Sequence, residues 1–152
     1  MRRLSPRYSY LFYLVLIAIF SCSAFAALGG DITSIQADQA HMRAQRRVIQ
    51  NTAYSVHEMQ IESTTVVREF VSPEGKVFGI SWQGSARPDL QQMLGSYYSE
   101  FAQAAPTRRL RGPVTIHTPN LVIQSGGHMR ALAGRAYIPA MVPAKVRFED
   151  IK

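Results

Sequence analysis

Hydrophobic and polar positions alternate in the middle of the chain in a pattern typical of β-strands. Three segments rich in aromatic and β-branched residues, separated by turn-forming residues, span 53–61, 64–71 and 76–82. The last two flank the sequence SPEG, in which proline presets the φ angle of a tight turn and glycine tolerates positive φ. This pattern predicts antiparallel neighbours joined by a hairpin, with Phe78, Ile80 and Trp82 on one buried face.

Two other segments have the character of helices. Residues 31–50 contain no Gly or Pro and are rich in Ala, Gln and Arg, which predicts a helix from Asp31 to about Gln50. The stronger apolar periodicity lies between Leu90 and Ala105. This second helix must bury its apolar stripe, and the preceding strands offer the nearest large apolar surface.

Further strand-like runs follow at 114–118, 121–125, 129–138 and 145–148, with turns predicted at Pro119-Asn120 and Gly126-Gly127. Prolines at 139 and 143 place the tail along a sheet edge, because proline cannot donate a ladder hydrogen bond. The order of helix, strands, helix and strands is typical of an α+β protein. We therefore predict a single domain with two helices packed on a largely antiparallel sheet of about six strands.

The first 26 residues have the three parts of a signal peptide. Arginines at 2, 3 and 7 precede an apolar run over residues 10–20, and the small-x-small tripeptide Ala24-Phe25-Ala26 follows. We expect cleavage after Ala26, which makes 1–26 a signal peptide and 27–152 a single α+β domain. A retained membrane anchor is the alternative, but a spanning helix needs about 20 apolar residues and serines interrupt this run.

Cys22 is the only cysteine of the chain, and its role depends on that boundary. A lipoprotein anchored at Cys22 would need a small or aliphatic lead-in, to which Phe20 is a poor fit. Otherwise Cys22 leaves with the signal peptide, and disulfides, thiol nucleophiles and cysteine metal sites are excluded from the mature protein.

Much of the basic character of the chain also belongs to the signal. The net charge is +7, but residues 1–26 hold three of the 17 basic residues and none of the ten acidic ones. Fourteen basic and ten acidic residues then give the mature protein a charge of +4. This charge favours weak attraction to anionic surfaces and does not indicate nucleic acid as a partner.

No sequence motif indicates a metal or another cofactor. The four histidines, at 41, 57, 117 and 128, are separated by 16, 60 and 11 residues and form no short ligand pair. If both predicted turns after residue 113 are tight, His117 and His128 point to opposite faces of the sheet. We therefore expect no metal site and no cofactor.

The catalytic candidates are weak. The chain contains no GxSxG nucleophile elbow, and the best remaining pair is Ser125 with His128, which would need an acid from elsewhere. A hairpin turn explains the same residues more simply. The sequence SGGHMRALAGR at 125–135 lacks the lysine and the following helix of a phosphate-binding loop.

Arginines near residue 110 suggest contact with an anionic lipid, lipopolysaccharide or polysaccharide, and nearby tyrosines would stack on sugars. The candidate ligand-binding residues are Arg108, Arg109, Arg111, Arg130, Tyr97 and Tyr98. Arg135 is a further basic residue that could join this set. The alternative is a solvated basic loop after a helix.

Three longer segments carry a family resemblance: ALGGDITSIQADQAHMRAQRRV at 27–48, REFVSPEGKVFGISWQGSARPDLQQMLGSYY at 68–98 and SGGHMRALAGRAYIP at 125–139. Together they resemble a family of uncharacterised exported proteobacterial proteins, domain of unknown function 2844. The resemblance implies export and a mature boundary near Ala27. It implies no activity, and it assigns no catalytic residue.

These observations favour an exported protein of the bacterial envelope, in the periplasm or outside the cell, without enzymatic activity and without a membrane span after cleavage. Its partner would be an anionic envelope component or another envelope protein, and not nucleic acid. Two alternatives stay open. One is a periplasmic hydrolase using Ser125 and His128, and the other is a secretion or assembly accessory that offers a strand edge.

Overall fold

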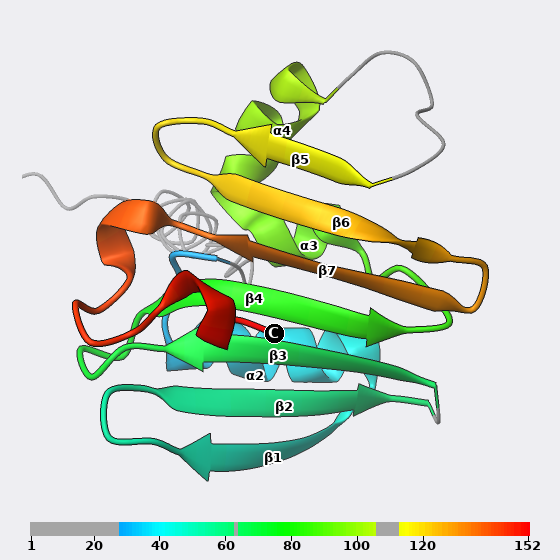
Figure 1. Ribbon diagram of the computed structural model, residues 1–152. Helices are drawn as coiled ribbons and strands as arrows, with labels where there is room; N and C mark the ends of the chain where they lie inside the picture. Colours follow the sequence, from blue (N-terminus) through cyan, green and yellow to red (C-terminus); the bar gives the residue numbers. More distant parts are fainter. Residues whose placement is uncertain (1–27, 63, 106–112) are drawn as a thin grey trace, which may run out of the picture.

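The computed structural model describes residues 28–62, 64–105 and 113–152, so Cys22, Ala26 and the candidate arginines at 108, 109 and 111 lie outside the described residues. Its centre is a seven-stranded antiparallel sheet of order β1-β2-β3-β4-β7-β6-β5 (Figure 1). The predicted α+β class is confirmed, with seven strands rather than about six. The strands are β1 (Gln45–Gln50), β2 (Ser55–Ile61), β3 (Thr65–Val71), β4 (Val77–Gly84), β5 (Val114–His117), β6 (Val122–His128) and β7 (Ala131–Tyr137).

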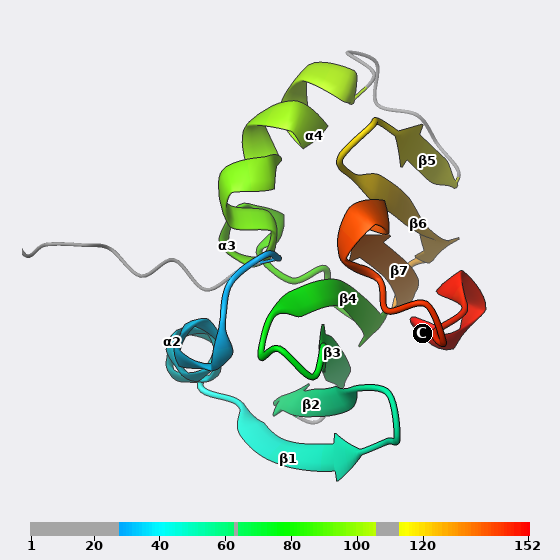
Figure 2. The same cartoon turned by 90° about the vertical axis from the view of Figure 1, so that its left-hand side faces the viewer.

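Helices cover one face of the sheet and the C-terminal tail, residues 138–152, crosses the other (Figure 2). We call these faces the helix side and the tail side. The helices are α2 (Ile32–Met42), α3 (Leu90–Leu94) and α4 (Tyr98–Ala104), and the short 3-10 turns are η1 (Gly95–Tyr97), η2 (Pro139–Met141) and η3 (Phe148–Asp150). Helices α3 and α4 occupy the second predicted helical segment, which is interrupted at Gly95, where φ is 51°. No helix in the described part of the chain is long and apolar enough to cross a membrane.

The seventh strand comes from the segment predicted as one long helix. Helix α2 ends at Met42, and Arg43 adopts the left-handed conformation with φ 49° and ψ 38°. Residues 45–50 then pair with β2 along their whole length, and Arg47 forms an ion pair with Glu58 at 2.7 Å. Gln and Arg favour helices locally, but pairing with a neighbouring strand outweighs this weak propensity.

Two of the three predicted turns are confirmed. The SPEG turn joins β3 to β4, with Gly75 at φ 78°, and the Pro119-Asn120 turn joins β5 to β6. The prediction of a turn at Gly126-Gly127 was wrong, because both glycines lie within β6 and the chain turns at Met129-Arg130. A Cβ at Gly127 would lie 2.1 Å from the carbonyl oxygen of Ala131, so this glycine permits close approach of the strands.

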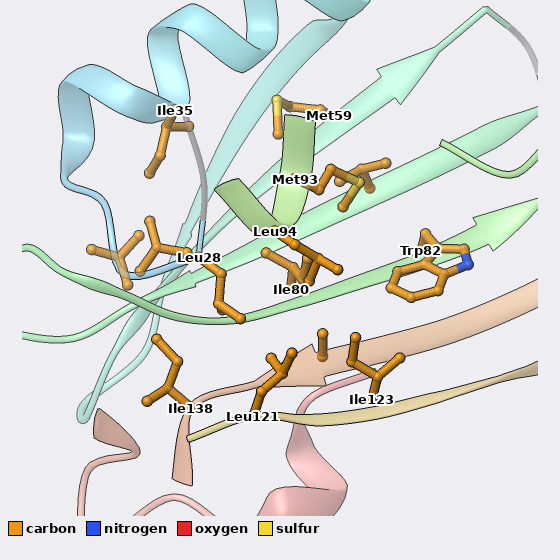
Figure 3. Close-up of a cluster of buried hydrophobic side chains, with 14 of the residues drawn as sticks. Leu28, Ile35, Met59, Ile80, Trp82, Met93, Leu94, Leu121, Ile123 and Ile138 are labelled. Atoms are coloured by element: carbon orange, nitrogen blue, oxygen red, sulfur yellow. The ribbon is translucent and has the colours of Figure 1, made fainter. Parts of the chain in front are cut away.

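Buried side chains form a core on each side of the sheet. The helix-side core, part of which is drawn in Figure 3, includes Leu28, Ile35, Met59, Val67, Ile80, Trp82, Met93, Leu94 and Ile123. The tail-side core consists of Val56, Phe70, Phe78, Val122, Tyr137, Val146 and Ile151. The predicted edge position of the tail and its predicted strand at 145–148 were therefore wrong. Apolar side chains on β2, β3, β4 and β6 need a cover on this face, and the tail supplies it.

Phe78 corrects another prediction about faces. The register shifts between Phe70 and Val71, which pair with Gly79 and Val77, so Phe78 is passed over. This irregularity turns Phe78 to the tail side, where its ring centroid lies 6.2 Å from that of Phe70. Ile80 and Trp82 keep the predicted common face in the helix-side core.

Candidate functional site

A cleft of about 410 Å³ lies on the tail side, where β4, β7, β6 and β5 are neighbours. Pockets that hold small ligands have volumes of roughly 300–1,000 Å³. Its floor includes Gln83, Gln124, Gly126 and Ala133, and Ile151 and Lys152 of the tail form a wall. We call it the C-terminal cleft.

Small residues create this hollow. Gly126 and Ala133 are cross-strand partners on β6 and β7, and Ala133 is also paired with Gln83 of β4. Partners in an antiparallel pair share one face, so two of these three neighbouring positions present almost no side chain. The sheet surface therefore lies lower here than under the tail-side core.

Arg135 brings a positive charge to the cleft. Its Nε donates to Oε1 of Gln124 at 2.7 Å, and its Nη1 donates to the backbone carbonyl of Phe148 at 2.7 Å. Within the described residues no carboxylate pairs with this guanidinium, and no bond engages its Nη2. The side chain is therefore fixed by neutral partners, and its charge stays available to a ligand.

The structure does not bring the two catalytic candidates together. Ser125 borders the C-terminal cleft, but its cross-strand partners Val114 and Gly134 place its side chain on the helix side. His128 is exposed at the end of β6. The two residues are three positions apart on an extended strand, so their side chains leave on opposite faces of the sheet. No Asp or Glu is among the described residues that line the cleft, so an acid for a triad is missing there as well.

The aromatic candidates lie on the helix side. Tyr97 and Tyr98 pack against the helix-side core, and the ring centroid of Tyr98 is 5.8 Å from that of Phe101. Arg130 is exposed in the turn between β6 and β7, at φ 70°. Of the candidate ligand-binding residues that the structure describes, Arg135 alone lines the C-terminal cleft.

Two acidic side chains on the helix side are buried, and the sequence patterns did not identify either of them as notable. Asp38 of α2 is 0% exposed and Glu69 of β3 is 2% exposed. Burial raises the pKa of both carboxyl groups, and at Glu69 the hydrogen bond with Asp38 and the charge of Asp38 raise it further. Gln92 of α3 donates its Nε2 to Oδ1 of Asp38 at 2.8 Å. These groups join both helical segments to the sheet, and their burial keeps a substrate away, so we interpret them as structural.

The histidines give no indication of a metal site. His57 is 6% exposed, and burial together with the charge of Arg46 lowers its pKa. In residues 28–62, 64–105 and 113–152, no group of three His, Cys, Asp or Glu side chains is arranged to hold a metal ion.

The family model described as "Protein of unknown function (DUF2844)" matches residues 24–151. The chain belongs to the DUF2844 family. No curated protein and no solved structure matches it. In this DUF2844 protein the matched range contains the whole sheet, Arg135 and Ile151 of the cleft wall.

Proposed function

We propose that this DUF2844 protein is a non-enzymatic binding protein of the bacterial envelope that holds an anionic component in the C-terminal cleft. The observation that carries this proposal is the guanidinium of Arg135, which is fixed in the cleft by an amide and a carbonyl and has no carboxylate partner among the described residues. A planar guanidinium with free N–H groups matches the two oxygens of a carboxylate or a phosphate.

The surroundings of Arg135 favour an anion further. No Asp or Glu side chain is among the described residues that line the cleft. Much of the lining is apolar, which reduces the competition from water and strengthens a charge-assisted hydrogen bond. Without a nucleophile and base in contact, the lining supports binding rather than catalysis.

Replacing Arg135 with glutamine is expected to weaken binding of an anionic probe about 10-fold or more, because a hydrogen bond to a charged group contributes about 1.5–3 kcal/mol. Calorimetric titration with glucuronate and with glycerol 3-phosphate measures this effect and separates a carboxylate from a phosphate preference. Arg135→Lys keeps the charge and loses the planar fork, so it should restore only part of the affinity.

Arg147→Gln is the matched control, because Arg147 lies on the tail, is paired with Asp150 and has a side chain 78% exposed. If both substitutions weakened probe binding equally, the effect would come from the loss of one positive charge and not from the position of Arg135. Failure of every anionic probe to bind the folded wild-type protein would contradict the proposed function.

Export is part of the proposal and is supported by the position of Leu28. Leu28 is 2% exposed, and its N–H donates to the carbonyl of Met93 at 2.9 Å. The first residue that the structure describes, two positions after Ala26, is thus already packed. We expect envelope fractions to contain a protein whose first residue is Ala27, as determined by mass spectrometry of the intact chain. A lipid-modified Cys22 at the amino terminus, or a full-length chain in the cytoplasm, would contradict this.

A further inference from the structure

One row of cross-strand partners on the tail side runs through all seven strands. From β1 to β5 it consists of Arg47, Glu58, Arg68, Ser81, Arg135, Gln124 and Thr115. Partners in antiparallel pairs share a face, so these side chains leave the sheet on the same side. We call this set the polar row. It contains Arg135, which brings the positive charge to the C-terminal cleft, and Gln124, which accepts a hydrogen bond from Arg135.

The arginines occupy alternate strands of the sheet. Arg47, Arg68 and Arg135 lie on its first, third and fifth strands, β1, β3 and β7. Because neighbouring strands are about 4.8 Å apart, successive arginines are about 10 Å apart along a line across the sheet. Glu58 is the only acid in the row and is paired with two of them, with Arg47 at 2.7 Å and with Arg68 at 2.8 Å. The row keeps an excess of two positive charges.

The adjoining row on the same face is rich in amides. It contains Gln45, Gln60 and Gln83 on β1, β2 and β4, together with Ala133 and Gly126 at the cleft. Figure 1 looks onto this face and shows the tail crossing one end of the strands, while no described element crosses their other end. Gln45, Gln83 and Ala133 are exposed there. Within the polar row, Glu58 is 9% and Ser81 is 2% exposed. The exposed surface that continues into the cleft is therefore the amide-rich row, and the guanidinium groups of Arg47 and Arg68 lie beside it.

We propose that the anionic component is a linear polysaccharide bearing carboxylates, with one acidic sugar in the C-terminal cleft and the chain lying across the strands on the amide-rich row, beside the arginines of the polar row, towards Arg47. This rests on the proposed function of the cleft. One strand spacing is close to the length of one sugar residue in an extended chain, so alternate residues reach successive arginines. Glutamine amides donate to and accept from sugar hydroxyls. The polar row contains no aromatic side chain on which nucleotide bases would stack.

The test is a length series of galacturonate oligomers, from the monomer to the octamer, titrated by calorimetry at fixed salt. Affinity should rise with length until the row is spanned and then level off. Arg47→Gln changes a side chain 70% exposed and should weaken the octamer about threefold while leaving the monomer unchanged. Arg135→Gln should weaken both. Arg87→Gln, an exposed arginine before α3, is the charge-matched control and should change neither.

Glu58→Gln provides a test with the opposite sign. Removing the acid frees Arg47 and Arg68 from their ion pairs, so affinity for the octamer should increase while the monomer is bound as before. Monomer binding that does not increase with length, or an Arg47→Gln effect equal to that of Arg87→Gln, would overturn the polysaccharide inference and leave the proposed function intact. Equally tight, equally Arg47-dependent binding of single-stranded DNA of matched charge would also overturn it. Absence of all binding, monomer included, would instead defeat the proposed function.

Discussion

Replacing Gly134 with alanine is expected to destabilise the fold by about 3 kcal/mol, in the upper range for overpacking in a core. A Cβ at this position would lie 2.2 Å from Cζ2 and 2.5 Å from Cε2 of Trp82, and 2.9 Å from the carbonyl oxygen of Gln124. Trp82 is 2% exposed and its ring is enclosed by the helix-side core. The clash can be relieved only by moving the indole against its neighbours or by separating β7 from β4. Urea unfolding followed by circular dichroism measures the loss.

Gly79→Ala is the control for this prediction. The nearest atoms to its Cβ are the side-chain tips Cδ1 and Cγ2 of Ile151, at 3.2 and 3.3 Å, which can shift by a few tenths of an ångström. We expect a loss below about 1 kcal/mol there. Combining Gly134→Ala with Trp82→Phe should cost less than the sum of the two single changes, because the smaller ring vacates the site of the clash. Equal stability of the two alanine variants would contradict the prediction.

Stability is also expected to fall as the pH rises above about 4.5, the ordinary pKa of a glutamate, because Glu69 holds its proton in the folded protein. Burial, then the hydrogen bond with Asp38 and the charge of Asp38, raise the pKa of Glu69 well above that value, and the charge of Arg46 lowers it only in part. Between the unfolded and the folded pKa the folded state binds more protons, so the free energy of unfolding decreases with pH throughout this window. Each pKa unit between the two states costs about 1.4 kcal/mol, and the loss levels off above the folded pKa.

Glu69→Gln should remove most of this dependence, because an amide of similar shape has no proton to lose. We expect the variant to unfold at higher urea concentration than the wild type at pH 8 and to differ less from it at pH 4. Glu62→Gln is the control, since Glu62 is exposed and its substitution should leave the slope unchanged. His57, whose lowered pKa contributes a slope of the opposite sign, is present in both proteins, so the test is the difference between them. An equal change of stability with pH in the wild type and in Glu69→Gln would show that Glu69 is ionised in the folded state.

Local sequence predicted those elements whose conformation depends on near neighbours. The SPEG turn forms as expected, because proline and glycine set backbone angles without help from the rest of the chain. The strand at 45–50 was missed for the complementary reason. Its residues, QRRVIQ, favour a helix in isolation, and only pairing with β2 makes them a strand. The end of α2 was equally hidden, since Arg43 adopts a left-handed conformation without the glycine that usually marks one.

The candidate site depends on which residues of neighbouring strands are cross-strand partners, and local sequence patterns do not reveal this register. Arg135 was a candidate because of its charge, but Arg47 and Arg68 share a row with it only once four strand pairings are known. The same holds for Asp38 and Glu69, which lie 31 positions apart and meet because α2 packs over β3. The glycines at 126 and 127 were interpreted as a turn, and their function in the strand emerges only from what a Cβ would meet. Long-range packing decides each of these features.

The arrangement of the sheet also has a kinetic consequence. Every pairing except β4 with β7 joins strands that follow one another in the chain, so β1 to β4 and β5 to β7 each form by local hairpin contacts. The β4–β7 pair must close a loop from Gly84 to Leu132, and the entropy of that closure is lost before its contacts are gained. We therefore expect the β1–β4 and β5–β7 meanders to form early. The slow final step is then the pairing of β4 with β7, in which Trp82 and Gly134 are cross-strand partners. Until then the row of arginines is divided between two halves, so the binding surface exists only in the last state to form.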